Sequence, residues 1–286
     1  MRSEAVELAT ITLETARGGF AVRIAGQSGG PLVVCLHGFA DDARTFDALL
    51  ARLTASGMRA VAPWLRGYAP SPLQGPVRGD ELVADVLAFG DALAPGKAMH
   101  LVGHGVGAQI VYRALARAPA RFERAVTLGM PHPAAVAANA LLSPAQAWRS
   151  AYLSLFRVPR LAEWVLSRHN FAYVERLWRK WSPGFDPPRM HLQGVKLTLM
   201  LSLPAPLAYY RDDEPPDPRP IRVPTLCLLG ERDGCVAPEL GAGQERFFKA
   251  PLVTEVIGGA GHFLHLERPE LVGSKVANFL EGGRVG

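Results

Sequence analysis

The chain has 286 residues, 49% of them hydrophobic and 20% charged, which is enough apolar content to bury a large core without disulfide or metal support. No apolar run approaches the roughly 18 to 20 residues of a membrane span. The opening MRSEAVELAT has neither the basic start nor the apolar run of a signal peptide. We therefore expect a globular protein that is neither inserted into a membrane nor secreted.

Charge and cysteine content narrow the expected partners and location. The net charge is +5 and the pI is about 9.3, but the sequence has no basic run, no zinc-ligand spacing and no aromatic residues interleaved with Lys or Arg. We therefore expect no nucleic-acid partner. Three cysteines cannot form a disulfide framework, and Cys35 and Cys227 lie in apolar runs typical of buried strands. A cytoplasmic location fits this pattern.

The first 130 residues alternate between strand-like and helix-like segments, which predicts an α/β fold with a mostly parallel sheet flanked by helices. Continuous apolar runs such as LVVCL are typical of parallel strands buried on both faces. A hairpin is expected around Gly18 and Gly19. The predicted strands are 7–15, 20–25, 32–36, 58–62, 99–102 and 125–129, and the predicted helices are 44–56, 80–94 and 106–117.

Residues 134–219 read as helices interrupted by prolines, before strands resume at 224–229. This predicts a helical cap, or lid, inserted into a core made of residues 1–133 and 220–286. The cap holds eleven Lys and Arg against seven Asp and Glu, a net charge of +4. Its charge indicates either a solvated helical surface or attraction of an anionic ligand.

The segment MHLVGHGVGAQIVYRALA predicts a strand, a sharp turn and a helix, with the turn at the carboxyl edge of the sheet. Residues 103–107 read Gly-His-Gly-Val-Gly and match the nucleophile elbow Gly-x-nucleophile-x-Gly except at its centre. Gly105 stands where a Ser, Asp or Cys is expected. Because glycine has no side chain, it cannot act as the nucleophile.

After the elbow, two further predicted strands are followed first by an acid and then by a base. This is the chain order expected after a nucleophile elbow. Asp233 follows one apolar strand and His262 another, so His262 is the expected base and Asp233 its orienting acid. Glu231 and Asp213 are possible substitutes for the acid. The backbone N–H groups of Phe39 and Val106 are expected to form an oxyanion hole. His37 and His104 are expected to have structural roles.

With these motifs in place, the sequence resembles the α/β-hydrolase superfamily over essentially its full length, in particular the branch of epoxide hydrolases and haloalkane dehalogenases. The resemblance rests on HGF at 37–39, LRGYAPS at 65–71, VGHxVGA at 102–108, TLGMPHP at 127–133 and GHFLHLERPE at 261–270. In such enzymes an elbow Asp attacks carbon and forms an ester, which a water activated by His then hydrolyses. This sequence departs from the pattern at Gly105 and at Ala40, where a proline is common.

The resemblance also implies substrate-binding residues in the cap. Tyr152 and Tyr210 resemble two tyrosines that hold the epoxide oxygen, with Tyr209 a weaker substitute for the second. Tyr152 and Tyr210 could instead be packing residues of the cap. The tryptophans are expected in the core or the cavity wall, and we assign Trp148 to substrate binding. The expected substrate is a mainly apolar small molecule, and no metal or organic cofactor is implied.

Gly105 leaves three functional hypotheses open. An engineered replacement of the nucleophile would inactivate an otherwise complete site. A natural enzyme could use the Asp–His pair for chemistry without a covalent intermediate. A binding protein could use the capped pocket without catalysis. If the missing nucleophile were Ser rather than Asp, the substrates would be esters or lactones in place of epoxides or haloalkanes.

Overall fold

The computed structural model describes residues 7–141, 143–211 and 214–283 of the chain. Within this part an eight-stranded sheet has the order β1-β2-β4-β3-β5-β6-β7-β8. The pairs β1–β2 and β2–β4 are antiparallel and the other neighbouring pairs are parallel. The strands are β1 (Ala9–Thr15), β2 (Gly18–Ala25), β3 (Leu32–Leu36), β4 (Arg59–Pro63), β5 (Met99–His104), β6 (Phe122–Leu128), β7 (Thr225–Gly230) and β8 (Leu252–Ile257).

Helices connect the strands and fill the insert between β6 and β7. Those of the core are α1 (Asp47–Ala55), α2 (Gly79–Leu93), α3 (Val106–Arg117), α11 (Leu264–Glu267) and α12 (Pro269–Leu280). Those of the insert are α4 (Pro133–Ala140), α5 (Pro144–Arg149), α6 (Ala151–Phe156), α7 (Leu161–Ser167), α8 (Ala172–Trp181), α9 (Arg189–Ser202) and α10 (Ala205–Ala208). Short 3-10 helices are η1 (Ala43–Phe46), η2 (Pro119–Arg121), η3 (Pro238–Gly241) and η4 (Gln244–Phe247).

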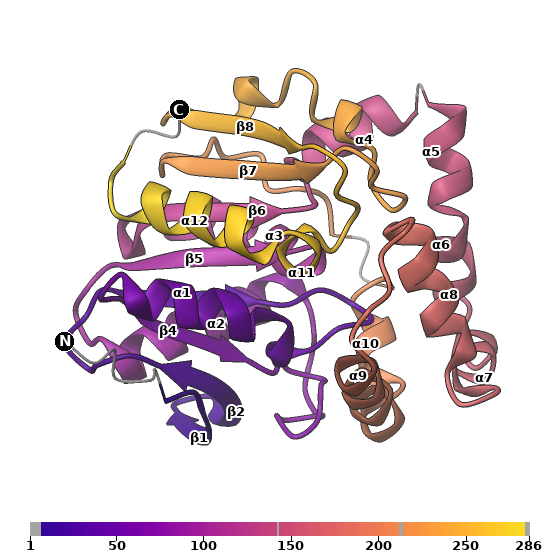
Figure 1. The fold of residues 1–286 in the computed structure, drawn as a ribbon, viewed down its shortest axis with the longest axis horizontal. Helices are drawn as coiled ribbons and strands as arrows, with labels where there is room; N and C mark the ends of the chain where they lie inside the picture. Colours follow the sequence, from indigo (N-terminus) through magenta and orange to yellow (C-terminus); the bar gives the residue numbers. More distant parts are fainter. Residues whose placement is uncertain (1–6, 142, 212–213, 284–286) are drawn as a thin grey trace.

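The core helices cover both faces of the sheet. The chain moves one way along the sheet from β3 to β4 and the opposite way from β4 to β5, so right-handed crossovers put α1 and α2 on opposite faces. Helix α1 packs against α12, in front of the sheet in Figure 1, and α2 packs against α3. Strands β3 and β5 are consequently buried along their whole length.

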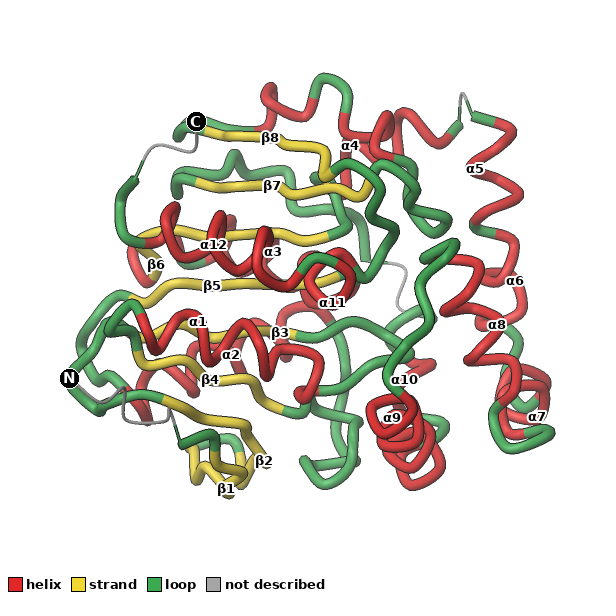
Figure 2. Tube along the Cα trace, in the orientation of Figure 1, coloured by secondary structure: helices red, strands yellow, loops and turns green. Residues whose placement is uncertain are grey.

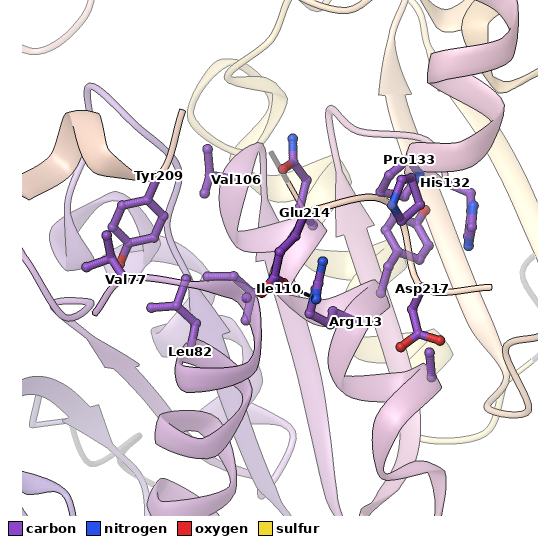
Figure 3. Close-up of a pocket in the computed structure, with 15 residues that line it drawn as sticks. Val77, Leu82, Val106, Ile110, Arg113, His132, Pro133, Tyr209, Glu214 and Asp217 are labelled. Carbon is purple, nitrogen blue, oxygen red and sulfur yellow. Dashed lines mark hydrogen bonds and ion pairs between the residues drawn. The ribbon is translucent and has the colours of Figure 1, made fainter. Parts of the chain in front are cut away.

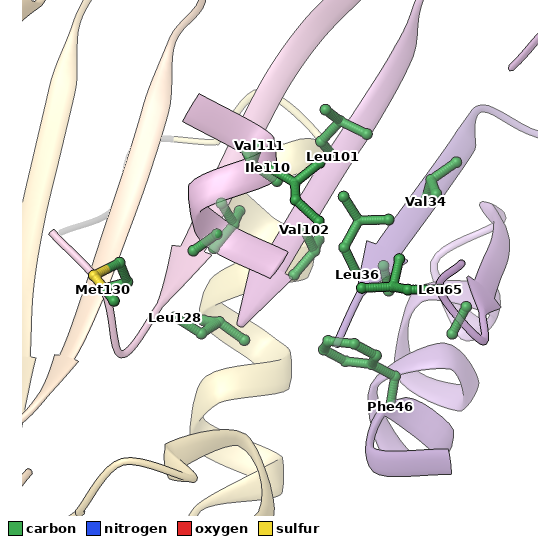
Figure 4. Close-up of a cluster of buried hydrophobic side chains, with 14 of the residues drawn as sticks. Val34, Leu36, Phe46, Leu65, Leu101, Val102, Ile110, Val111, Leu128 and Met130 are labelled. Atoms are coloured by element: carbon green, nitrogen blue, oxygen red, sulfur yellow. The ribbon is translucent and has the colours of Figure 1, made fainter. Parts of the chain in front are cut away.

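The central core joins β3, β5 and α3. Figure 4 shows Val34 and Leu36 of β3 beside Leu101 and Val102 of β5, with Ile110 of α3 packed over them. All five side chains are buried. The carboxyl ends of β3 and β5 are therefore anchored by apolar packing.

The insert stands beyond the carboxyl ends of the parallel strands. Figure 1 shows α5 to α10 on the side of the sheet to which the arrows of β5, β6 and β7 point, and the tube in Figure 2 shows the same arrangement. Ligands of open α/β sheets bind at this edge. In the part of the chain that the structure describes, no helix is long and apolar enough to cross a membrane.

Three sequence predictions differ in detail from the structure. The hairpin turn is formed by residues 16–17 rather than by Gly18 and Gly19, because Thr15 pairs directly with Gly18. The predicted helix 44–56 divides into η1 and α1, since the Asp42 side chain accepts from the Arg44 N–H and starts a tighter turn. Strand β6 begins at Phe122, before the predicted start at residue 125.

The start of α3 lies directly on the ends of two strands because glycines remove the Cβ atoms between them. A Cβ atom on Gly107 would lie 2.0 Å from the carbonyl oxygen of Leu36, and one on Gly103 would lie 2.5 Å from that of Gly107. Both separations are shorter than van der Waals contact. Glycine at these two positions therefore permits the strand–turn–helix geometry of residues 99–117.

We predict that Gly107→Ala destabilises the protein although alanine is the better helix former. The added methyl group must displace the backbone at Leu36, so we expect a loss of about 1 to 3 kcal/mol in the free energy of unfolding. Urea denaturation measures it. The control is Gly258→Ala, whose Cβ atom meets nothing within 4 Å. Equal stability of the two variants would contradict the close approach of α3 to β3.

Candidate active site

Gly105 occupies the turn between β5 and α3 in a conformation that favours glycine. Its φ is 54° and its ψ is −115°, the left-handed half of backbone space in which a nucleophile elbow is strained. A Cβ atom built on Gly105 would lie 3.4 Å from Nε2 of His262. The structure therefore aims any side chain at position 105 directly at the His262 ring.

Asp233 and His262 form a buried pair, as predicted from sequence. Asp233 follows β7 and His262 follows β8, and Nδ1 of His262 lies 2.8 Å from Oδ2 of Asp233. The other carboxylate oxygen, Oδ1, accepts from the N–H groups of Cys235 at 2.7 Å and Val236 at 2.8 Å. With its carboxylate thus held, Asp233 orients the imidazole so that Nε2 faces position 105.

The electrostatic environment makes His262 a stronger base than a free histidine. Burial alone would lower its pKa, but the negative charge of Asp233 and the hydrogen bond to it, with a contribution from Cys235, raise the pKa well above 6.5. The imidazolium form is therefore stabilised by the buried carboxylate. A proton taken up at Nε2 would be held firmly.

The end of α8 holds the acid and base loops together. The carbonyl oxygen of Trp181 accepts from the N–H of His262 and from that of Gly234, each at 3.0 Å. One residue later, Oγ of Ser182 accepts from the N–H of Phe263 at 3.0 Å. The insert thus supplies backbone and side-chain acceptors that tie the loops carrying Asp233 and His262 to each other.

The loop after β3 lies beside position 105. The Cα atom of Gly38 would be 3.7 Å from a Cβ atom on Gly105, and both Phe39 and Val106 line the adjoining cavity. Val106 is the first residue of α3, so its N–H has no acceptor within the helix. Ala40 has a φ of 60°, which the ring of proline forbids, and this explains the departure from the common proline at that position.

A cavity of about 270 Å³ lies between this edge of the sheet and the insert. Gly105 and His262 line it on one side, and Tyr152 and Tyr210 line it on the other. The two tyrosine rings are 6.5 Å apart, and burial raises the pKa of each well above 10. Both hydroxyl groups therefore stay protonated at neutral pH and can donate hydrogen bonds.

The structure corrects the assignment of Trp148. Its side chain is 77% exposed and borders a surface hollow outside the cavity, because α5 turns this residue toward solvent. The tryptophan that lines the cavity is Trp181, which is buried beside Tyr152 and His262 with ring separations of 5.1 and 5.6 Å. The sequence has no signal that distinguishes these two tryptophans, since both lie in predicted helices of the insert.

Three weaker candidates are also placed. Tyr209 donates to the backbone oxygen of Arg66 at 2.6 Å and does not line the cavity. Glu231 is exposed and accepts from the N–H of Gly259 at 2.7 Å, so it does not replace Asp233. Asp213 lies outside the described residues.

Cys235 and Gln146 line the cavity and were missed by the sequence analysis. Sγ of Cys235 lies 3.3 Å from the hydroxyl oxygen of Tyr152. Gln146 donates to the backbone oxygen of Cys235 at 2.8 Å and accepts from the N–H of Ala237 at 3.1 Å, which joins α5 to the acid loop. The only available signal was the position of Cys235 two residues after Asp233.

His37 shapes the loop after β3. Its Nδ1 donates to the backbone oxygen of Gly38 at 2.9 Å, and its Nε2 accepts from the N–H of Leu65 at 3.1 Å. Because both ring nitrogens are used within the core and burial lowers its pKa, the ring is neutral. The expected structural role of His37 agrees with these contacts.

Among the described residues, one cluster has the composition of a metal site. The possible ligand atoms of Asp41, His104 and His265 lie within 4.8 Å of one another, whereas the ligands of tetrahedral zinc are about 3.5 Å apart. Burial lowers the pKa of both histidines, that of His265 to about 4, so both are neutral. His104 donates from Nε2 to the backbone oxygen of His262 at 3.0 Å. None of the three lines the cavity.

Figure 3 shows a second pocket, of about 130 Å³, on the other side of Val106. Arg113 dominates its polar wall and is paired with Glu214 and with Asp80. Asp217, at the rim, pairs with Arg117 at 2.7 Å. The charges of this second pocket therefore neutralise one another, and His262 does not line it. The larger cavity, which His262 lines, is the candidate active site.

Comparison with solved structures supports the fold. A structure described as novel epoxide hydrolases from metagenomes of hot environments has a TM-score of 0.81 at 24% identity and covers 96% of this chain and 98% of its own. A putative acyltransferase from Salmonella enterica has a TM-score of 0.83 at 20% identity, with coverage of 99% and 98%. At these identities the likeness shows a shared fold.

Sequence comparison identifies the family. Epoxide hydrolase 4 of Mus musculus is 27% identical over 270 residues, which are 90% of this chain and 75% of the relative. Epoxide hydrolase 3 of Xenopus tropicalis is also 27% identical over 270 residues, covering 90% and 73%. The family model described as the alpha/beta hydrolase family matches residues 33–274. The chain therefore belongs to the alpha/beta hydrolase family and is an α/β-hydrolase of the epoxide-hydrolase-like branch.

Proposed function

We propose that the protein opens epoxides of mainly apolar small molecules by direct attack of water, without a covalent enzyme intermediate. The observation that carries the proposal is the free space at Gly105. A Cβ atom there would lie 3.4 Å from Nε2 of His262, so with glycine this volume joins the cavity directly in front of the base. A water molecule just beyond this point, where the outer atoms of a longer side chain at position 105 would lie, would be within hydrogen-bonding reach of Nε2.

In the proposed reaction, His262 removes a proton from this water through Nε2 while the water oxygen attacks an epoxide carbon. The carbon–oxygen bond breaks, and the oxygen that leaves carbon takes a proton from Tyr152 or Tyr210. Transfer of the proton from His262 to the tyrosinate restores both groups, so the net change is addition of water to give a vicinal diol. Asp233 stabilises the imidazolium during the step. The N-terminal dipole of α3 favours the negative charge that develops on the attacking oxygen.

The remainder of the cavity supports the expected substrate class. Its walls include the apolar side chains of Met130, Val136, Leu153 and Val236 together with Tyr152, Tyr210 and His262. Such a site binds an apolar body and directs one polar group toward the donors. A small epoxide with aryl or alkyl substituents has this form.

The proposal includes the organisation and location of the protein. Residues 134–219 would act as a lid over a core of residues 1–133 and 220–286, which is supported by the helices between β6 and β7. The small-molecule partner then enters beneath the lid. A cytoplasmic location is supported by three buried free cysteines.

Substitutions at position 105 separate direct attack from covalent chemistry, with styrene oxide as the probe. Gly105→Ala should lower turnover about 100-fold, because the added methyl group, 3.4 Å from Nε2, crowds the space in front of His262 that the attacking water needs. Gly105→Asp should form an ester with the substrate, which mass spectrometry of the quenched protein detects as added mass. The unsubstituted protein should show turnover and no adduct.

The outcomes of this series are distinct. An inactive unsubstituted protein with an active Gly105→Asp variant would contradict direct attack and indicate that only the nucleophile is missing. Ester hydrolysis by Gly105→Ser, with no epoxide opening by Gly105→Asp, would identify an ester or lactone hydrolase site. Ligand binding without turnover in any variant would indicate a binding protein.

The pH dependence of turnover tests the acid–base pair. Since the pKa of His262 is raised well above 6.5, the base is protonated at low pH, and activity should rise with pH through that pKa. Asp233→Asn removes the charge that raises it, so the rise should move to lower pH while turnover falls by about 100- to 10,000-fold. His262→Ala should abolish turnover. The control Glu231→Gln should leave the profile unchanged, and an unshifted profile in Asp233→Asn would contradict the pairing.

The cap tyrosines are tested by removing single hydroxyl groups. Tyr152→Phe and Tyr210→Phe should each lower kcat by about 100-fold, because each loses a donor to the developing alkoxide. Steady-state kinetics with styrene oxide measures the effect. Tyr209→Phe is the matched control, since its hydroxyl donates to the backbone of Arg66 outside the cavity. Unchanged kcat in both test variants would assign these tyrosines to packing.

A further inference from the structure

The outward face of α9 is apolar. Met190, Leu197, Met200 and Leu201 are 51% to 79% exposed, and their spacing of 7, 10 and 11 residues from Met190 puts them on one side of the helix. The opposite side, with Val195 and Leu199, is buried. A surface helix normally presents polar residues outward, so α9 has apolar residues on both faces.

Helix α7 extends this apolar surface. Leu161 and Trp164 are 46% and 55% exposed. A hollow of about 450 Å³ is lined by Trp164 and Phe171 on one side and by Met200 and Leu203 on the other, so the two helices share one surface. Figure 1 shows α7 and α9 at the same end of the insert. We call the exposed residues 161, 164, 190, 197, 200 and 201 the α7–α9 face.

Basic residues flank the α7–α9 face. Three arginines lie at its border: Arg160 precedes Leu161, Arg189 precedes Met190, and Arg168 follows α7. All three are exposed. The guanidinium of Arg168 lies over the ring of Trp164, 4.7 Å from its centroid.

Two acidic side chains of the insert, one on α7 and one on α8, are already paired. Glu163 is bound by Arg211 at 2.9 Å, and Glu175 is bound by Lys196. Both carboxylates are therefore neutralised within the insert, whereas the arginines at the border point their charge outward. The border of the face is positive, which complements an anionic partner.

We propose that the α7–α9 face docks on the surface of an anionic lipid bilayer. Exposed Trp, Leu and Met side chains enter the boundary between headgroups and acyl chains, while arginines beside them interact with anionic headgroups. A second copy of the chain fits less well. A two-fold interface places the same patch on both partners, so it would gather the arginines of both copies at one interface.

This arrangement differs from insertion of a spanning helix and does not depend on the chemistry proposed for the cavity. The contact is made by the outer side of the insert, whereas Tyr152, Tyr210 and Trp181 of the same insert line the cavity. Docking would hold the protein at a surface in which apolar small molecules dissolve. It would be reversible and weakened by salt, since part of the attraction is between exposed charges.

The test is sedimentation of the full chain with vesicles of phosphatidylcholine alone and of phosphatidylcholine mixed with phosphatidylglycerol. We expect binding to the anionic vesicles that falls as salt is added. The double substitution Leu197→Glu and Met200→Glu should lower the partition coefficient by roughly tenfold or more. Arg160→Gln should lower it by roughly fivefold on anionic vesicles only. Leu271→Glu is the matched control, because Leu271 is 47% exposed on α12, outside the insert.

Size-exclusion chromatography with light scattering is run on each variant. Binding lost in the Leu197/Met200 variant and kept in the Leu271 variant, with unchanged thermal melts, would support the proposal. Absence of vesicle binding, equal binding to both kinds of vesicle, or equal loss in the control would overturn it. A dimer that the Leu197/Met200 substitutions dissociate, without vesicle binding, would overturn it in favour of self-association.

Discussion

The buried hydrogen bond between Asp233 and His262 is the constraint on which the geometry of the candidate site depends. Both side chains are almost fully buried, and a carboxylate removed from water must be compensated by donors. His262 and the N–H groups of Cys235 and Val236 supply them. The same contacts fix the direction in which Nε2 of His262 points. The hydrogen bonds that stabilise the buried carboxylate therefore also orient the imidazole.

This pair stays in place because the insert and the core share its support. The backbone oxygen of Trp181 accepts from the loops that carry the acid and the base, although these loops follow different strands. Trp178 of the same helix donates from Nε1 to the backbone oxygen of Ala40 at 2.7 Å, in the loop after β3. A single helix, α8, therefore contacts all three loops around position 105. Movement of α8 would disturb the base and the neighbouring backbone amides together.

Gly105 changes the chemistry of the site without changing the shape of the elbow. The strained φ that a nucleophile would have to accept is retained, and glycine adopts it at little cost. Gly103 and Gly107 continue to hold α3 against the strand ends. The turn thus keeps a conformation that would point a side chain into the cavity. With glycine at position 105, the place of that side chain is open toward the cavity. The proposed direct attack by water would use this open place, which is why position 105 is the most informative one to substitute.

The sequence by itself determined the strand–turn–helix at 99–117, the order of acid and base and the helical insert, because local spacing and apolar runs encode them. The α/β-hydrolase fold expected from them was confirmed by the family match and the sheet.

Only the tertiary structure decided which side chains of the insert face the cavity. Trp148 and Trp181 both lie on short helices of the insert, and their exposure depends on how α5 and α8 pack against the core. The contact of Cys235 with Tyr152 joins residues 83 positions apart. The α7–α9 face joins two helices, and which side of each helix is exposed cannot be recognised until their packing is known. Local periodicity records that a helix has an apolar side, but the tertiary packing determines what that side meets.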